Sequence, residues 1–389
     1  MRVLAITKIF PNSLEPLSSP FNRQQFKALA TRCELTVLEA IPYVPGARLT
    51  GIPPRAAKLA TLPARETVDG IETVYMKQLY VPKLGVPVAV PLFLGSLLPF
   101  RRLARGFDVV LATWAYPDAC ASILFARTLG KPCVFKVHGS DLNVLARRPS
   151  ARLGMRKILP LADGAVAVSR ALGDTLEELG VPREKIALVA NGVDTALFYP
   201  RDKRGARRAR GLPEGAPVLM FCGRLEPQKG LGELLEAFDT VRAKRPDARL
   251  VLIGDGVMKK AVQERAATSG GAIVVPGARP LTEVAEWMAA CDVFTLPSWA
   301  EGTPNVVLEA LASGRPAVGS RVGGIPDVLS DPRSGIVVPP KNAAALAQGL
   351  LRALERTWDP AEVSACGPSS WDESGAKLYG VLEKAMKRP

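Results

Sequence analysis

The sequence contains few cysteines and few aromatic residues, and both shortages argue against whole classes of protein. Its six cysteines are spread over 389 residues without a Cys-x-x-Cys pair, so neither a disulfide framework nor a structural zinc site is expected. Aromatic residues make up 6% of the chain and do not alternate with the basic clusters, which argues against a groove for single-stranded nucleic acid. No zinc-finger spacing or recognition-helix pattern is present either. We therefore expect a reduced protein that binds no nucleic acid.

Long apolar runs are also missing from the sequence. The uncharged apolar stretch at residues 86–100 is too short to span a bilayer and contains Pro87, Pro91 and Pro99. Residues 1–6 resemble a strand and lack the apolar region of a signal peptide. These absences predict a cytoplasmic protein without a transmembrane anchor.

What the sequence does have is an ordinary apolar content and a large excess of positive charge. Apolar residues make up 48% and charged residues 23%, as in typical globular proteins. The 51 Lys and Arg residues exceed the 37 Asp and Glu residues, which gives a formal charge of +14. Such an excess indicates an anionic partner, and a membrane surface together with a phosphorylated small molecule fits best.

The length and the hydrophobic pattern predict two α/β domains. A chain of 389 residues exceeds what one hydrophobic core usually organises. Short β-branched runs alternate with longer amphipathic segments, the pattern of βα units on parallel sheets. The strands of the first half are expected near residues 3–6, 35–38, 109–111, 134–137, 165–168 and 186–189. Those of the second half are expected near 218–221, 250–253, 273–275, 293–296, 317–318 and 336–338.

A change of composition separates the two series of strands. Residues 199–217 are rich in Arg, Lys, Gly and Pro, which predicts an exposed basic linker. We expect doubly wound, Rossmann-like lobes at 1–198 and 218–367, with a last helix at 368–389 that packs back on the first lobe. Because ligands of such sheets bind beyond the carboxyl ends of the strands, we expect the site in the cleft between the lobes.

An acidic string that follows the strand at 293–296 carries the strongest functional signal. It reads Glu301-Gly302-Thr303-Pro304-Asn305-Val306-Val307-Leu308-Glu309. Thr303 is expected to cap a helix whose first residue is Pro304, where a missing N–H costs nothing. The helix N-terminus favours a phosphate, and Glu301 and Glu309 can accept hydrogen bonds from hydroxyls on either side of it. A single glutamate is more often a solvated or capping acid, but the whole string favours a nucleotide-sugar site.

A second string supplies two cations. Gly223-Arg224-Leu225-Glu226-Pro227-Gln228-Lys229-Gly230 follows the first strand of the second lobe. Arg224 lies at the carboxyl end of this strand and Lys229 before the next helix, where both can neutralise a diphosphate and stabilise it as it leaves. Isolated Arg and Lys residues are usually solvated, but this place in an α/β sheet favours a functional role.

His138 is the only histidine in the chain. A lone histidine is more often structural than catalytic. This one follows the strand at 134–137 and precedes a Gly-Ser turn, so we expect it to project into the cleft as an active-site residue. Asp141 is a weaker candidate, because it could equally cap the following helix.

Taken together, these motifs resemble glycosyltransferase family 4. The resemblance rests on the two strings above and, in the family's usual order, on His138-Gly139-Ser140-Asp141, Asn191-Gly192-Val193-Asp194 and Gly323-Gly324-Ile325-Pro326-Asp327. It covers nearly the whole chain. It implies the GT-B fold, with two Rossmann-like lobes facing across a cleft, and a retaining glycosyltransferase that requires no metal or other cofactor.

The resemblance also implies roles for individual residues. His138 would border the transferred sugar, Glu301 would bind the hydroxyls of that sugar, and Arg224 and Lys229 would hold the diphosphate. The other donor-binding positions would be Glu309 at the ribose, Gly223, Gly302, Thr303, Pro304, Asn305, Val306 and Val307 at the phosphate seat, and Ala278 and Arg279 near the base.

The loop after the first strand departs from the family pattern. Relatives often carry a Gly-Gly pair there, where the backbone approaches the donor phosphate, but residues 11–21 contain no glycine. The hydroxyls of Ser18 or Ser19 are candidates to replace that contact. We expect this loop to shape the acceptor site.

Two missing motifs and two alternative functions bear on the same assignment. No Asp-x-Asp pair is present, which disfavours the metal-dependent, single-lobed plan, and no Gly-x-Gly-x-x-Gly opens a helix after a strand, which disfavours a nicotinamide dehydrogenase. A sugar-nucleotide epimerase would need further acid or base groups in a chain with one histidine. An inactive sugar-nucleotide-binding scaffold is disfavoured by the intact set Glu301, Glu309, Arg224 and Lys229.

The first lobe combines apolar and basic residues. Residues 86–100 are followed at once by Arg101, Arg102 and Arg105, and a second basic run lies within 147–157. This pattern is typical of docking on anionic lipid and equally of a core-facing helix with a solvated basic end. Docking would favour transfer of a hexose from a UDP- or GDP-sugar to a lipid-linked or glycan acceptor, in surface polysaccharide or glycolipid biosynthesis.

Overall fold

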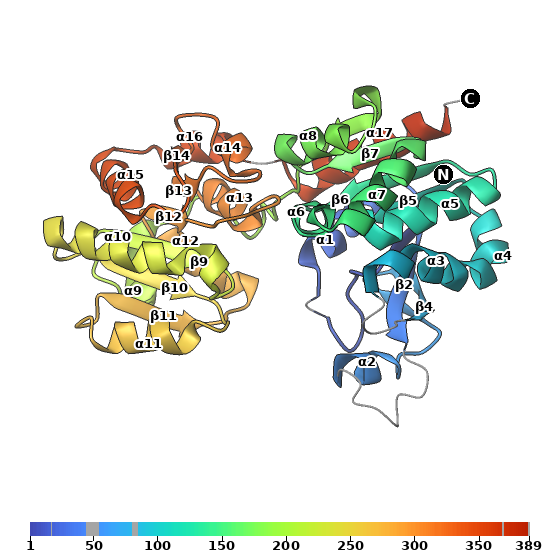
Figure 1. Cartoon of the computed structure of the whole chain (residues 1–389). Coiled ribbons are helices and arrows are strands. Elements are labelled where there is room, and N and C mark those ends of the chain that lie inside the picture. Colours follow the sequence, from blue (N-terminus) through green and yellow to red (C-terminus); the bar gives the residue numbers. More distant parts are fainter. Residues whose placement is uncertain (17, 44–53, 80–84, 368, 388–389) are drawn as a thin grey trace. The chain divides into compact units, whose positions relative to one another are not determined.

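The computed structural model describes residues 1–16, 18–43, 54–79, 85–367 and 369–387 (Figure 1). The chain forms two compact units, each with its own sheet. Unit 1 comprises Met1–Asn191 and Trp371–Pro389, and unit 2 comprises Gly192–Ser370. The two α/β sheets, parallel in all but one strand, confirm the predicted fold class.

The sheet of unit 1 has the strand order β3-β4-β2-β1-β5-β6-β7-β8. Its neighbouring strands are parallel, except that β3 pairs antiparallel with β4. The chain runs outward from β1 and then returns to β5 on the other side of β1, so the topological switch point lies between β1 and β5. The strands are β1 (Arg2–Thr7), β2 (Glu34–Tyr43), β3 (Arg65–Val68), β4 (Ile71–Leu79), β5 (Val109–Thr113), β6 (Cys133–Val137), β7 (Gly164–Ala167) and β8 (Ile186–Leu188).

Strand β1 shows why the inner strands of this sheet are continuously apolar. Leu4 and Ile6 enter one apolar cluster and Val3 and Ala5 enter another, and all four are fully buried. Successive side chains point to opposite faces, so both faces of the sheet are covered. Strands β3 and β4 were not predicted, because the edge strand β3 and its neighbour β4 mix polar with apolar residues.

Helices and short helical turns cover the sheet of unit 1. Its helices are α1 (Pro20–Ala30), α2 (Pro54–Leu59), α3 (Gly85–Leu97), α4 (Arg101–Arg105), α5 (Cys120–Thr128), α6 (Ser140–Asn143), α7 (Pro149–Ile158), α8 (Arg170–Glu178) and α17 (Trp371–Met386). Its short turns are η1 (Leu98–Phe100), η2 (Ala115–Ala119), η3 (Leu145–Arg147), η4 (Leu159–Leu161) and η5 (Arg183–Lys185).

The last helix, α17, packs against α1 (Figure 1). A Cβ atom at Gly375 would lie 2.7 Å from the Cβ of Ala28, so the two helices approach where glycine leaves room. The Gln25 amide donates a hydrogen bond of 2.9 Å to Ser374 Oγ, and that hydroxyl donates one of 2.8 Å to the carbonyl of Ala190. These contacts join the two segments of the chain that build unit 1.

One helical stretch in the described part of the chain, Gly85–Arg105, is long and apolar enough to cross a membrane by length and composition alone. This helical stretch is longer than the uncharged run at residues 86–100, because the helix continues through η1 into the arginines of α4. Helix α3 packs against β4 and α5 and buries Val90, Phe93 and Leu97. One face of this stretch therefore belongs to the core of unit 1.

The sheet of unit 2 is parallel throughout, with the strand order β11-β10-β9-β12-β13-β14. Its switch point lies between β9 and β12. The strands are β9 (Val218–Cys222), β10 (Arg249–Ile253), β11 (Ile273–Gly277), β12 (Val293–Leu296), β13 (Ala317–Ser320) and β14 (Gly335–Val338). The helical elements are α9 (Lys203–Ala209), η6 (Pro227–Lys229), α10 (Leu231–Lys244), α11 (Lys259–Ala267), α12 (Leu281–Ala290), α13 (Asn305–Ala312), α14 (Ile325–Val328), α15 (Ala343–Glu355) and α16 (Pro360–Ala365).

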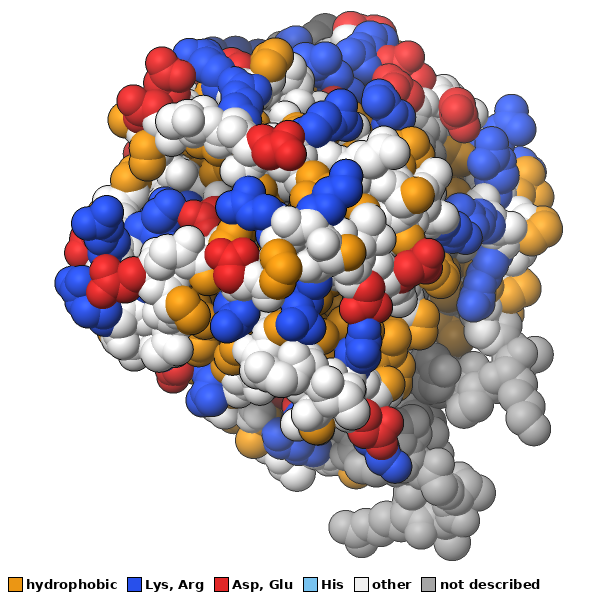
Figure 2. Space-filling view, turned by 90° about the vertical axis from the view of Figure 1, so that its left-hand side faces the viewer, with side chains coloured by type: hydrophobic (Ala, Val, Ile, Leu, Met, Phe, Trp, Pro, Cys, Tyr) orange, Lys and Arg blue, Asp and Glu red, His pale blue; other side chains and the backbone are white. Residues whose placement is uncertain are grey.

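The basic stretch 199–217 lies within unit 2 rather than between the two units, although most of its residues are exposed or partly exposed, as its composition predicts. It forms α9, which packs against α12 within unit 2. Arg207 is only 3% exposed, donates a hydrogen bond of 2.9 Å to the carbonyl of Ala290 and pairs with Asp292. Figure 2 views the left-hand side of Figure 1, where basic and acidic side chains are intermixed.

Candidate active site

Two loops meet at the switch point of unit 2. One follows β9 and holds residues 223–230, and the other follows β12 and holds residues 297–304. The backbone N–H of Trp299 donates a hydrogen bond of 2.9 Å to the carbonyl of Gln228, which joins the loops directly. Parallel sheets bind ligands at this point, and the two strings singled out in the sequence lie there.

Lys229 and Glu301 form the central contact between these loops. Their Nζ and Oε1 atoms are 2.7 Å apart, and Ser298 Oγ donates a hydrogen bond of 2.6 Å to the same Oε1. The side chain of Lys229 is 26% exposed and that of Glu301 is 11% exposed. An ammonium group carries three N–H donors, so Lys229 can hold Glu301 and still donate to a phosphate.

Two glycines let the loop backbones approach closely. Gly230 has a φ of 72°, and a Cβ atom there would lie 2.1 Å from the carbonyl oxygen of Pro297. Gly323, with a φ of 52°, would place a Cβ atom 2.0 Å from the carbonyl oxygen of Glu301. Side chains at these positions would push the loops apart, so both glycines position the pair formed by Lys229 and Glu301.

Helix α13 begins one residue later than the sequence predicts. Pro304 is its N-cap and Asn305 its first residue, and the proline forms no side-chain cap hydrogen bond, so Thr303 does not hold the N-cap position. The backbone N–H of Val307 donates a hydrogen bond of 2.9 Å to the carbonyl of Pro304. The positive end of α13 therefore lies in the loop that carries Glu301, as a phosphate seat requires.

Glu309 lies within α13, one turn after Asn305. Its Oε2 atom is buried and has no hydrogen-bond partner, and burial raises the pKa of this carboxyl to about 7. The thiol pKa of Cys222 is raised to about 12, first by burial and then by the charge of Glu309. The charge of Glu309 therefore acts on Cys222, which ends β9 beside the switch point.

Arg224, the second cation predicted to hold the diphosphate, is exposed in the structure. Its side chain is 76% exposed and forms an ion pair with Glu226, although the adjoining Gly223 lies at the end of β9 as expected. Ala278 and Arg279 follow β11 and are exposed, with Arg279 Nε 3.7 Å from Glu283. Ala278 and Arg279 therefore lie at the edge of the sheet, where β11 is the last strand.

In unit 1, His138 follows β6 and contacts aromatic rings. The ring centroids of His138 and Phe21 are 4.8 Å apart, and those of His138 and Trp114 are 6.5 Å apart. Burial, together with the charge of Lys136, lowers the pKa of His138 well below its usual value, and its Nε2 atom is buried without a hydrogen-bond partner. This imidazole is therefore neutral at physiological pH.

Asp141 holds the loop around His138. Its carboxylate accepts backbone hydrogen bonds from the N–H groups of Ala115, His138, Gly139 and Leu142, at 2.7 to 3.2 Å. Burial raises the pKa of this carboxyl, and these hydrogen bonds oppose the effect. Asp141 is thus a positioning residue rather than a helix cap.

Ser18 and Ser19 lie at the start of α1. Ser19 is the N-cap of this helix, in a left-handed backbone conformation and without a side-chain cap hydrogen bond. The two hydroxyl oxygens are 3.5 Å apart. Phe21, two residues after Ser19, contacts His138, so the segment that carries these serines also reaches that histidine.

Known proteins match nearly the whole of this architecture. Residues 50–197 match the family described as Glycosyltransferase Family 4, and residues 216–356 match Glycosyl transferases group 1. The GDP-mannose-dependent alpha-mannosyltransferase of Mycobacterium tuberculosis is 32% identical over 281 residues, which cover 70% of either chain. The chain belongs to glycosyltransferase family 4.

Two further proteins resemble this family 4 chain over nearly its full length. The glycosyltransferase TuaC of Bacillus subtilis (strain 168), named for teichuronic acid biosynthesis, is 28% identical over 382 residues, 92% of this chain and 91% of its own. The crystal structure of Anabaena Alr3699/HepE in complex with UDP superposes with a TM-score of 0.68 at 18% identity, over 99% of this chain and 97% of that chain. The second likeness confirms the predicted GT-B fold.

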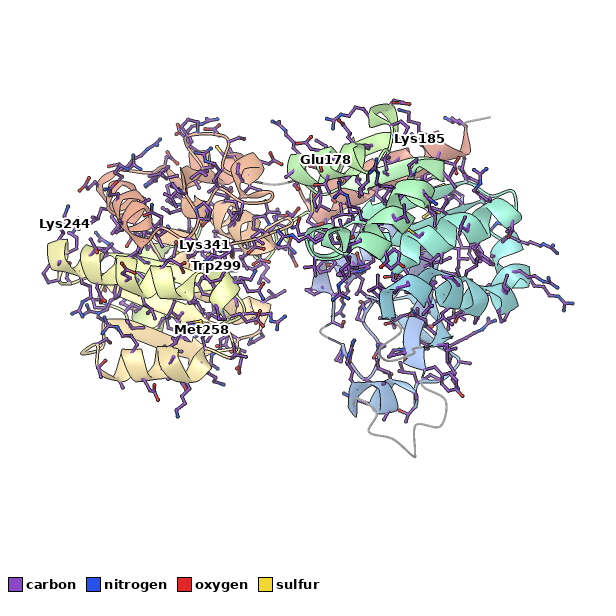
Figure 3. The ribbon with its side chains drawn as sticks, viewed as in Figure 1. Glu178, Lys185, Lys244, Met258, Trp299 and Lys341 are labelled. Carbon is purple, nitrogen blue, oxygen red and sulfur yellow. The ribbon has the colours of Figure 1, made fainter. Side chains whose placement is uncertain are left out.

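Near the two loops of this family 4 chain, the structure shows a cavity that the sequence did not indicate. A cavity of about 650 Å³ beside the loop after β9 is lined by Met258, Trp299 and Lys341, among others (Figure 3). Lys341 Nζ lies 4.6 Å from the ring centroid of Trp299, and the indole N–H donates a hydrogen bond of 3.0 Å to Glu233. The tryptophan next to Ser298 was the only sequence signal for this cavity.

Lys136 is another residue that the sequence did not single out. It lies in β6 and is fully buried, and its Nζ atom donates to Gln25 Oε1 at 2.5 Å and to Asn191 Oδ1 at 3.3 Å. Burial lowers the pKa of this ammonium group to about 7. The sequence predicted a strand at residues 134–137 from its apolar residues, and this pattern does not indicate that the lysine within it is buried.

Proposed function

We propose that the protein is a retaining hexosyltransferase that moves a sugar from a UDP- or GDP-linked donor to a hydroxyl of a lipid-linked or glycan acceptor. The observation that carries this proposal is the contact of 2.7 Å between Lys229 and Glu301 at the switch point of unit 2. A cation, a carboxylate and the N-terminus of α13 converge there. A ligand with a diphosphate next to sugar hydroxyls needs this combination.

In the proposed reaction the diphosphate lies on the first turn of α13 and contacts Lys229. Negative charge grows on the diphosphate as the bond between the anomeric carbon and the phosphate oxygen breaks. A fixed cation and a helix dipole stabilise that charge, which is usually the largest contribution to such a reaction. Because Lys229 and α13 supply this positive charge, we propose that the reaction needs no metal.

The acceptor oxygen then forms the new bond to the anomeric carbon. Its proton passes to the departing diphosphate oxygen, and the nucleoside diphosphate leaves. Attack on the face from which the diphosphate departs retains the configuration. Membership of family 4 supports this stereochemistry.

The two glutamates have different proposed tasks. Glu301 is held by Ser298 and Lys229, so it can orient the sugar through hydrogen bonds to its hydroxyls. Glu309 has a buried oxygen without a partner, which suits the hydroxyls of the ribose. His138 would border the transferred sugar, and Arg224 would turn from Glu226 to the diphosphate.

The relatives support a nucleotide-sugar donor and a surface polysaccharide product. The mycobacterial relative is named for its dependence on GDP-mannose, and the Anabaena protein was crystallised with UDP. The Bacillus relative is named for teichuronic acid biosynthesis. UDP and GDP therefore remain alternative donors.

A thermal-shift panel of UDP-, GDP- and ADP-sugars tests the donor assignment. A donor that binds the folded protein raises its Tm by mass action, and Glu301→Gln should reduce that rise. The matched control is Glu264→Gln, which changes an exposed glutamate of α11. If no sugar nucleotide raises the Tm, or if the donor is isomerised without any acceptor, the proposed transfer is wrong.

We further propose that unit 1 docks on the cytoplasmic surface of an anionic membrane. The stretch that includes α3 continues into Leu98, which is 52% exposed, and then into the exposed Arg101 and Arg102. On α7, Leu153 is 55% exposed, and basic residues adjoin it. Exposed leucines beside arginines suit the boundary between lipid head groups and acyl chains.

Flotation with phosphatidylglycerol and phosphatidylcholine vesicles tests the docking proposal. Changing Arg101, Arg102 and Arg105 together to serine should weaken binding to phosphatidylglycerol about a hundredfold, at about 1 kcal/mol for each charge. The charge-matched control changes exposed residues of unit 2 and combines Lys244→Ser, Lys260→Ser and Arg352→Ser. Equal binding by both triple variants would contradict docking through α4.

A further inference from the structure

A cavity of about 390 Å³ lies inside unit 1, beyond the carboxyl ends of β2 and β4. Residues from the end of β2, from α2, from the end of β4, from the start of α3 and from η2 line it. Lys8 follows β1 and Tyr116 follows β5, so the cavity reaches the switch point of this sheet. It therefore occupies, in unit 1, the kind of place where α/β sheets bind ligands.

One wall of this cavity is apolar. Helix α3 contributes Val86, Ala89 and Leu92, which recur at every third residue and so share one face of the helix. Ile41 and Leu59, each 2% exposed, line it as well. This wall suits a hydrocarbon chain rather than a sugar ring, whose hydroxyls would lose their water without finding partners.

Three cations line the same cavity. Lys8 Nζ lies 3.3 Å from Asp118 Oδ1, and Arg55 makes two hydrogen bonds of 2.7 Å to Glu15. Arg148 is exposed and has no ion-pair partner in the part of the chain that the structure describes. The charge of Arg148 is therefore available to an anionic ligand, next to the apolar wall.

Glu39 supplies the polar group of the cavity. It is 4% exposed, and its buried Oε2 atom has no hydrogen-bond partner. Burial raises the pKa of its carboxyl to about 8, although the Asn12 side chain and the Phe10 backbone donate hydrogen bonds to it. Leaving a buried polar atom unpaired is unfavourable, so the unpartnered oxygen indicates a ligand hydroxyl as its missing partner.

We infer that this cavity binds the acceptor, and that the acceptor is a lipid phosphate that combines a phosphate group, a hydroxyl and a hydrocarbon chain. The phosphate meets Arg148 and Lys8, the hydroxyl meets Glu39, and the hydrocarbon follows the apolar face of α3. This inference rests on the proposed transferase function, and it specifies the class of acceptor. A water-soluble sugar phosphate shares the phosphate chemistry but would leave the apolar wall uncovered.

The helix that forms the apolar wall also favours a lipid as the source of the phosphate. After the cavity-lining residues of α3, the same helical stretch reaches the exposed Leu98 and the arginines of α4. A hydrocarbon chain that leaves the cavity along α3 therefore meets a surface suited to lipid.

Calorimetric titration of the full chain with three probes tests the inference. The probes are decyl phosphate, decyl glucoside, which lacks the phosphate, and inositol 1-phosphate, which lacks the hydrocarbon. We expect decyl phosphate to bind at least about tenfold more tightly than either of the others, because only it engages both the cation and the apolar wall. If inositol 1-phosphate binds as tightly as decyl phosphate, the ligand is a soluble sugar phosphate and the lipid assignment is wrong.

Variants then locate the binding. Arg148→Ser should weaken decyl phosphate binding about tenfold, whereas Arg147→Ser, at the exposed neighbour that does not line the cavity, should change it less than about twofold. Ala89→Trp should abolish binding by filling the apolar part of the cavity. Unchanged binding in both Arg148→Ser and Ala89→Trp would overturn the inference.

Glu39→Gln tests the contact with the hydroxyl in the transfer reaction. We expect the KM for a lipid phosphate acceptor to rise about fivefold while kcat changes little. Glu34→Gln, at the exposed beginning of the same strand, is the matched control. An unchanged KM in Glu39→Gln would remove Glu39 from the inference.

The same variants separate this inference from the proposed function. Donor-induced stabilisation depends on unit 2, so it should be intact in Arg148→Ser and Ala89→Trp. If the wild-type protein shows no donor binding but binds decyl phosphate, the proposed function fails and the lipid site stands. If donors bind and decyl phosphate does not, the lipid site fails alone.

Discussion

The two sheets place candidate sites at equivalent switch points, but they assemble these sites from the sequence in different ways. In unit 2, residues 223–230 and 301–309 suffice to build the contact between Lys229 and Glu301. In unit 1, the cavity draws on segments scattered between Lys8 and Arg148. A diphosphate needs a fixed cation at a helix N-terminus, which short strings can encode. An amphiphilic acceptor needs only apolar area and nearby charge, which many sequences supply.

The strongest way to break this comparison is to remove the cation of unit 2. We expect Lys229→Met to lower kcat/KM for sugar transfer about a thousandfold, because the departing diphosphate loses its fixed positive charge. The measurement is nucleoside diphosphate release with acceptor present. Decyl phosphate binding in unit 1 should not change.

Lys260→Met is the matched control for this variant. Lys260 lies on α11 with a side chain that is 90% exposed, and its ion pair with Glu264 is long, at 3.8 Å. Its transfer rate should stay within about twofold of the wild type. A loss of less than about tenfold in Lys229→Met would show that the motif does not hold the leaving group.

The second largest expected effect concerns the close approach of the backbone at Gly323 to the loop that carries Glu301. Gly323→Ala should destabilise the protein by about 3 kcal/mol, because a left-handed residue gains a Cβ atom in the space of a backbone carbonyl. The Cβ would lie 2.0 Å from the carbonyl oxygen of Glu301. Urea unfolding measures the loss, and donor affinity should fall with it.

Gly270→Ala separates the two causes of that loss. Gly270 also has a positive φ, 62°, but a Cβ atom there would meet nothing within 4 Å. It should cost only about 1 kcal/mol. Equal losses in the two variants would mean that the close approach at Glu301 does not constrain the loop.

The contrast between short strings in unit 2 and scattered segments in unit 1 also explains how much of each site could be predicted from the sequence. The places of Lys229 and Glu301 beside the switch point were predictable, because each residue stands in a string whose strand-end position was recognisable; their direct contact was not predicted. The start of α13 was misplaced by one residue because Pro304 takes the N-cap position where a hydroxyl cap was expected. Lys136 and Glu39 were missed because each lies in a strand that the sequence marks as buried and apolar. Only packing of distant segments makes these polar groups part of a site.

Glu309→Gln tests whether the buried acid of unit 2 is retained for function rather than stability. Its folded pKa of about 7 lies above the usual carboxyl pKa of 4.5, so the folded state binds more protons between these values. The wild type therefore loses stability as pH rises through this window. Above it, Glu309→Gln should be more stable by about 2 kcal/mol, yet bind donor less tightly. Denaturant unfolding at several pH values measures the stability, and donor titration measures the affinity. If Glu309→Gln is less stable than the wild type at high pH, the burial assigned to Glu309 is wrong.

Lys136→Met extends the comparison to unit 1, with the opposite sign. The folded pKa of Lys136, about 7, lies below the usual ammonium pKa of 10.5, so here the unfolded chain binds more protons between these values. In the wild type, the free energy of unfolding should therefore rise with pH across this window. In Lys136→Met this rise should be absent. The difference between the two should change by about 1 kcal/mol per pH unit just above pH 7. Lys157→Met, at an exposed lysine of α7, should keep the wild-type slope. If Lys136→Met keeps it too, the ammonium group is charged in the folded protein, and its bonds to Gln25 and Asn191 are charge-assisted.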